Sequence, residues 1–165
     1  MTMNRFFLSA AACLLAASSL FAQDNILDMR ENYNIGDVVT VTGVVTSDDN
    51  LGSVRYLQDA TAGIALYPGA DWSDWDATPA IGDSLTVTGE ITEYNGLLEV
   101  GPNLSAVTFQ GTGMVPEPQV VLPSALGEGL EGELVRINGV TFPLAGQEIT
   151  ANTYDFTADG ETGII

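Results

Sequence analysis

A near-duplicate of twelve residues is the feature that most constrains how this chain can fold. The stretch IGDVVTVTGVVT at residues 35–46 returns as IGDSLTVTGEIT at residues 81–92, which is 46 residues later. Both copies alternate apolar residues with Thr, the period-two pattern of a half-buried β-strand. One 46-residue unit holds too few strands to bury a core of its own. The repeat therefore predicts two long strands of one barrel, paired with each other.

Turn signals and apolar runs predict five strands in an all-β fold. The predicted strands cover residues 38–46, 53–59, 64–69, 84–94 and 97–109. Asn95 and Gly96 are a two-residue type I′ hairpin signal, and the last strand is expected to break at Gly101. A Gly inside a strand marks a bulge or a sharp bend, and Gly43 and Gly89 take the same place in the first and fourth strands. The prediction is a closed five-stranded barrel, with only a poor helix signal between strands three and four.

A third copy, EGELVRINGVTF at residues 131–142, predicts a second and related unit. The segment YDFTADGETGII after this copy resembles RYLQDATAGIAL after the first copy, at an offset of 96 to 100 residues. The matching positions are Gly43 and Gly139, Asp59 and Asp159, and Gly63 and Gly163. The Gly- and Pro-rich residues 113–130 fit a short extended linker. The predicted organisation is a barrel at 23–112, a linker at 113–130, and the start of a second, incomplete barrel-like module at 131–165.

Residues 1–22 have the pattern of a cleaved secretory signal peptide. Arg5 precedes an apolar run that ends in small residues at Ala22. We expect a secreted, periplasmic or cell-surface protein with no membrane span in the mature chain. Acylation at Cys13 is a less favoured alternative. Because Cys13 is the only cysteine and lies in the signal, the mature chain would contain no disulfide.

The charge and the missing residue types exclude many functions. The chain has 22 acidic and 4 basic residues, a net charge of −18, no Lys and no His. Nonspecific nucleic-acid binding depends on Lys and Arg releasing counterions, so the charge argues against a nucleic-acid partner. Catalysis by Ser-His-Asp, Cys-His or a Schiff-base Lys is impossible without those residues. We therefore expect a protein that is not an enzyme, with no cofactor other than a potential calcium ion.

At these residues the chain resembles the OB-fold modules of secreted bacterial proteins. The resemblance is carried by VTVTGVVT, YLQDATAGIALY and GDSLTVTGEITEYNGLLEV, and it covers residues 36–109 well and 132–165 in part. Bacteroidetes-type surface proteins carry such modules, often before an endonuclease/exonuclease/phosphatase domain or a sorting tail. The chain is also similar to small periplasmic bacterial OB-fold proteins. The resemblance implies a five-stranded OB-fold barrel with a truncated second OB-like module after it.

The OB-fold resemblance also indicates where a ligand would bind. The face of strands two and three, with the loops joining strands one to two and four to five, is the usual site. Placing Leu57, Ile64 and Leu66 inward turns their neighbours outward, and exposed aromatic side chains stack bases or sugars. The candidate ligand-binding residues are Arg55, Tyr56, Gln58, Tyr67, Trp72, Tyr94 and Asn95. For Arg55, pairing with a nearby Asp is the alternative.

A cluster of acids in the loop ADWSDWDATPA is a candidate calcium site. Asp71, Asp74 and Asp76 lie within six residues, and calcium prefers oxygen ligands. Their spacing is not that of a known calcium loop. The alternative is a solvated acidic loop whose residues Trp72 and Trp75 cap one end of the barrel.

Three functions stay open from the sequence. The first is a noncatalytic OB-fold binding or spacer module of an exported protein. The second is a nucleic-acid-binding accessory domain of an extracellular nuclease. The third is a calcium-dependent module that binds carbohydrate or protein.

Overall fold

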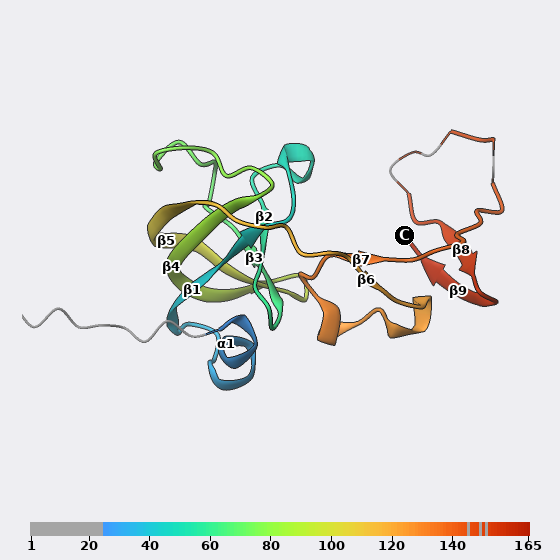
Figure 1. Cartoon of the computed structure of the whole chain (residues 1–165), viewed down its shortest axis with the longest axis horizontal. Helices are drawn as coiled ribbons and strands as arrows, with labels where there is room; N and C mark the ends of the chain where they lie inside the picture. The colour runs from blue at the N-terminus through green and yellow to red at the C-terminus, as the bar shows by residue number, and fades with distance from the viewer. Residues whose placement is uncertain (1–24, 145, 149, 151) are drawn as a thin grey trace, which may run out of the picture.

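Five strands close into a barrel, and the C-terminal strands lie to one side of it (Figure 1). The computed structural model describes residues 25–144, 146–148, 150 and 152–165, so the predicted signal peptide lies outside the described residues. The strands are β1 (Val38–Val45), β2 (Arg55–Gln58), β3 (Gly63–Leu66), β4 (Asp83–Tyr94) and β5 (Leu97–Thr112). Their order around the barrel is β1-β2-β3-β5-β4, with β3 parallel to β5 and the other pairs antiparallel. This is the OB-fold, as the sequence predicted.

The repeated segments are β1 and β4, and they pair with each other as expected. Val41 lies opposite Val87 in the antiparallel ladder, and both side chains are fully buried. The alternate positions face outward, where the Oγ1 atom of Thr40 is 2.8 Å from that of Thr88. Each copy thus supplies one apolar row to the core and one Thr row to the surface, which explains why the two sequences are so similar.

The glycines of the repeat lie where two chain segments approach closely. A Cβ atom on Gly43 would lie 2.7 Å from the carbonyl oxygen of Gln58, where β1 also pairs with β2. A Cβ atom on Gly89 would lie 2.8 Å from Cγ1 of Val100, and the β4–β5 register shifts beside Gly89. The predicted break at Gly101 is wrong, because β5 continues through that residue to Thr112.

A short helix that the sequence analysis did not predict, α1 (Ile26–Asn32), covers one end of the barrel (Figure 1). The side chain of Asn25 caps it by accepting a hydrogen bond from the N–H of Asp28. Ile26 and Met29 are fully buried and join the barrel core. Among the described residues between β3 and β4 there is no helix; there, the indole of Trp72 packs into the core instead.

The C-terminal part forms two small sheets. Strand β6 (Gln119–Val120) pairs in parallel with β7 (Val135–Arg136), and β8 (Asp155–Ala158) forms an antiparallel hairpin with β9 (Glu161–Ile164). The expected extended linker contains β6 and two 3-10 turns, at Pro123–Ala125 and Glu128–Leu130. It is therefore more structured than its composition indicated.

One bridge in the C-terminal part repeats a contact of the barrel. Thr141 bridges to Thr157. In the barrel, Val45 pairs with Leu57. Thr141 follows Val45 by 96 residues and Thr157 follows Leu57 by 100, which are the offsets between the sequence copies. The beginning of the second unit thus repeats a pairing of the first. The exact domain boundaries stay predictions.

Candidate ligand-binding face

The outer face of the barrel presents one row of side chains across four strands. Tyr56 on β2 lies opposite Ala65 on β3, which lies opposite Glu99 on β5, which in turn lies opposite Thr92 on β4. The adjacent positions on these strands are buried in the core; they are Leu57, Ile64, Val100 and Ile91. We call Tyr56, Ala65, Glu99 and Thr92 the outer row. Its members on β2 and β3, Tyr56 and Ala65, lie on the strands where OB-folds usually bind ligands.

The chain itself covers the side of the outer row near the β2–β3 turn. We call residues 128–134 the cover segment. A Cβ atom on Gly63 would lie 2.1 Å from the carbonyl oxygen of Gly132, so the two backbones are in direct contact. The N–H of Leu134 donates to Oε1 of Gln58 at 2.9 Å. Gln58, which we expected to face solvent, is consequently buried.

An ion pair holds the cover segment against the barrel. Nη2 of Arg30 lies 3.0 Å from Oε2 of Glu131, and both side chains are largely buried. Arg30 also donates to the carbonyl oxygen of Gly63 at 3.1 Å, and the N–H of Leu98 donates to Oε2 of Glu131 at 3.3 Å. This is the one ion pair within the described part of the chain. It uses one of the few cations for an internal contact.

Beyond the cover segment the outer row opens into a pocket. The pocket has a volume of about 260 Å³ and is lined by Val54, Tyr67, Tyr94 and Glu99. Tyr94 is 67% exposed, whereas Glu99 is only 6% exposed. The hydroxyl of Thr92 donates a hydrogen bond of 3.3 Å to Oε1 of Glu99.

Burial and acidic neighbours raise the pKa values on this face. Burial raises the pKa of the Glu99 carboxyl above its usual range, and the hydrogen bond from Thr92 only partly opposes this. Burial also raises the pKa of Tyr56, and the negative charges of Glu131 and Glu99 raise it further. The potential at the outer row is therefore negative, which disfavours a phosphate.

The structure brings together some of the predicted binding residues. Tyr67 and Tyr94 meet at the pocket, and Tyr56 lies in the outer row beside the cover segment. Asn95 lies in the hairpin turn just after Tyr94, with a positive φ of 53°. The sequence analysis missed Glu99, because its place beside β3 depends on a parallel pairing between strands that are distant in sequence.

Two predicted binding residues belong to the core instead. Arg55 is 2% exposed, and its guanidinium donates to the carbonyl oxygens of Pro79 at 2.9 Å and Gly52 at 2.8 Å. Its partners are thus backbone carbonyls, neither a ligand nor the Asp that we considered. Trp72 is 3% exposed and donates from Nε1 to the carbonyl of Ser53 at 2.7 Å. Trp72 therefore caps one end of the barrel, which the sequence analysis gave as the alternative for this loop. Its buried ring has no exposed surface on which a base or sugar could stack.

The candidate calcium ligands Asp71, Asp74 and Asp76 lie in the loop between β3 and β4. Asp71 accepts a hydrogen bond of 2.8 Å from the N–H of Ser73. Asp74 and Asp76 are exposed. In the part of the chain that the structure describes, no three acidic, His or Cys side chains are grouped so that they could hold a metal ion. Calcium binding at the three aspartates therefore stays a prediction.

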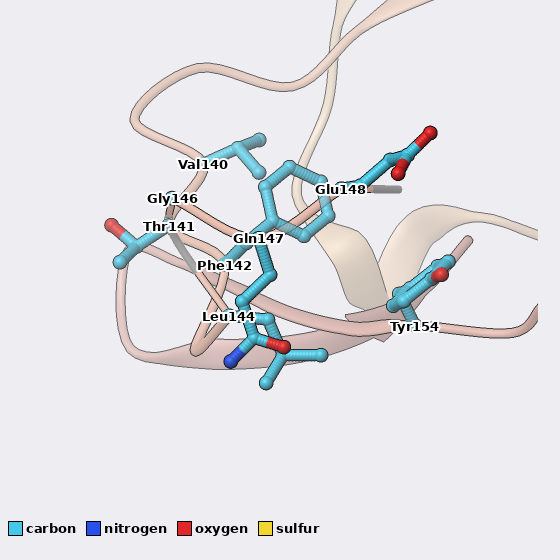
Figure 2. Close-up of a pocket in the computed structure, with 8 residues that line it drawn as sticks. All are labelled: Val140, Thr141, Phe142, Leu144, Gly146, Gln147, Glu148 and Tyr154. Carbon is cyan, nitrogen blue, oxygen red and sulfur yellow. The ribbon is translucent and has the colours of Figure 1, made fainter. Parts of the chain in front are cut away.

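A larger hollow lies in the C-terminal part, away from the outer row. Its volume is about 320 Å³, and the residues that line it are Val140, Thr141, Phe142, Leu144, Gly146, Gln147, Glu148 and Tyr154 (Figure 2). Glu148 is the one charged side chain among the lining residues, and most of those residues are exposed. Its exposed walls would bury little of a ligand, whereas a typical small-molecule site buries most of it.

The fold and its outer face define an OB-fold module whose usual binding surface is half covered and half open. No family model matches the chain. Over 128 residues it is 33% identical to the endonuclease YhcR of Bacillus subtilis (strain 168); the match covers 70% of this chain and 10% of that protein. Among solved structures it is similar to the hypothetical protein ygiW from E. coli, with a TM-score of 0.41 and 15% identity over 53% of this chain and 89% of that one. None of the described helices is long and apolar enough to cross a membrane.

Proposed function

We propose that this chain is a noncatalytic OB-fold binding module of an exported, larger protein, with its ligand site in the open half of the outer face. The observation that carries the proposal is the pocket between Tyr67, Tyr94 and the buried Glu99. Aromatic walls with one polar group at the base are typical of small-molecule sites. Without His or Lys, the chain cannot form a Ser-His-Asp or Cys-His constellation or a Schiff-base Lys, so only carboxylate chemistry remains to it.

The similarity to an endonuclease supports the proposal that this chain lies next to a catalytic domain in a longer protein. The chain spans about a tenth of that relative's length, so the match concerns one portion of a much longer protein. We infer that this chain likewise accompanies a nuclease-type domain, as the resemblance to Bacteroidetes-type modules also implied. Sequencing of the mature N-terminus checks the proposed export, with Gln23 as the expected first residue.

The second candidate is a nucleic-acid-binding accessory domain, which the same similarity favours. The electrostatics oppose it. Arg30 is engaged with Glu131, Arg55 is in the core, and Glu99 lies at the centre of the outer row. Proteins that bind single strands need a positive groove along the backbone as well as stacking aromatics. The described face has the aromatics and lacks the groove.

A titration with a labelled single-stranded oligonucleotide separates the two candidates. At physiological salt we expect no binding tighter than roughly 10⁻⁴ M, the weak end of nonspecific affinities. Micromolar binding without calcium would establish the second candidate instead. Binding only with calcium would indicate a metal-bridged site at Asp71, Asp74 and Asp76.

The binding module itself is tested by a ligand screen with NMR detection. Mixtures of small polar compounds are added to the isotope-labelled protein. We expect saturable shifts at Tyr67 and Tyr94 for at least one class of compound, and none at the buried Trp72. A broad screen without any shift in the pocket would argue for a spacer without a ligand.

A further inference from the structure

The pocket contains an acid that the protein has buried without a cationic partner. Glu99 is 6% exposed, and its one hydrogen bond in the described structure is the 3.3 Å contact from Thr92. The single ion pair of the described residues joins Arg30 to Glu131 and leaves Glu99 out. A buried carboxylate is costly unless it is paired or hydrogen-bonded. A ligand that carries a positive charge would offset this cost.

The other walls suit the same kind of ligand. Tyr67 and Tyr94 line the pocket together with Glu99, and the face of a tyrosine ring attracts cations within about 6 Å of its centre. Val54 adds an apolar surface for an alkyl chain. The net charge of −18 also draws cations toward the molecule. An anionic ligand would be repelled here, and a neutral one would leave the Glu99 carboxylate without a countercharge.

We propose that this pocket binds a small organic cation, with an alkylammonium group paired to Glu99 and its carbon chain packed between Tyr67, Tyr94 and Val54. The proposal rests on the proposed binding function and names the ligand class of that same site. The volume of about 260 Å³ lies just below the usual range of small-molecule pockets, roughly 300–1,000 Å³. It fits a short amine of a few carbons and excludes an oligomer.

The test compares two probes of the same shape that differ in charge. The isotope-labelled full chain is titrated with n-butylammonium and, separately, with n-butanol, and backbone NMR resonances are followed. We expect saturable shifts at Tyr67, Tyr94 and Glu99 with n-butylammonium only. Equal shifts with n-butanol would overturn the proposal, because the pocket would then recognise only the alkyl chain.

Two matched variants test whether the charge of Glu99 itself binds the amine. We expect Glu99→Gln to weaken n-butylammonium binding by about tenfold, the scale for losing one charge-assisted hydrogen bond. The control Glu117→Gln removes the same charge from an exposed position outside the pocket and should leave the affinity unchanged. Equal losses in both variants would show that only the overall charge attracts the amine, and that result overturns the site.

A third titration distinguishes failure of the cation proposal from failure of the proposed binding function. Glucose is added to the same labelled protein. If glucose shifts the pocket resonances and n-butylammonium does not, the cation proposal fails while the proposed binding module stands. If n-butylammonium binds to Tyr67→Leu as tightly as to the natural chain, the aromatic wall has no role and the proposal also fails.

Discussion

Glu99 is the residue at which stability and binding oppose each other most directly. It lies in the outer row between β3 and β4, where Ala65 and Thr92 are its cross-strand neighbours. Its burial disfavours the charged form, so its pKa is raised. Without a bound cation the charge therefore destabilises the fold, as is common for groups in functional sites.

Removing this charge should stabilise the protein in the absence of ligand. A carboxyl whose pKa is higher in the folded than in the unfolded state stabilises the fold at a pH below its unfolded-state pKa, which is about 4.3 for Glu. This stabilisation is lost as the pH rises through the folded-state pKa. We expect Glu99→Gln to raise the melting temperature at pH 7 by about 2–4 °C, or about 1 kcal/mol for a chain of this size. The gain should shrink toward pH 4. Thermal unfolding across that range checks this, and a constant or negative shift would contradict it.

The positions of single residues could be predicted only where they follow from a local pattern. Tyr67 and Tyr94 reach the pocket because strand alternation and the hairpin turn are local signals. Alternation alone cannot identify Arg55 as a core residue, because its partners come from the irregular backbone around Gly52 and Pro79. Glu99 was missed because the β3–β5 pairing joins segments more than thirty residues apart.

At the scale of elements, the repeat predicted the pairing of β1 with β4, and the outcome confirms it. Helix α1 and the docking of the cover segment were not predicted. Helix α1 is only 7 residues long, too short for a hydrophobic period to be recognised. The docking of the cover segment depends on two glycines, Gly63 and Gly132, and no local pattern relates such distant positions.

The close approach of these glycines gives a direct test of the docked cover segment. We expect Gly63→Ala to push the segment off the face, because the new Cβ would overlap the carbonyl of Gly132. The cost should be about 1–3 kcal/mol of unfolding free energy, the range for overpacking. Gly129→Ala is the control, since no atom lies within 4 Å of its Cβ position. Hydrogen exchange at Leu134 should accelerate in the first variant only, and an unchanged rate there would contradict the contact.

Over the whole molecule, stability should fall from the barrel toward the C-terminal sheets. The barrel closes all its edges, whereas β6–β7 and β8–β9 are two-stranded, and such small sheets are marginally stable alone. We expect amide hydrogen exchange to be slowest in β1 and β4 and at least about tenfold faster in β8 and β9. Equal protection in both parts would contradict this gradient.

The fate of the arginines has a practical consequence for proteolysis. Trypsin cleaves after Lys or Arg, and the described residues offer it three sites, since the chain has no Lys. Arg30 is held in its ion pair, and Arg55 lies in the core, which leaves the exposed Arg136. A brief digestion of the folded protein should therefore cut after Arg136. That cut would separate β8 and β9 from the rest of the chain, whereas the cover segment would stay attached to the barrel.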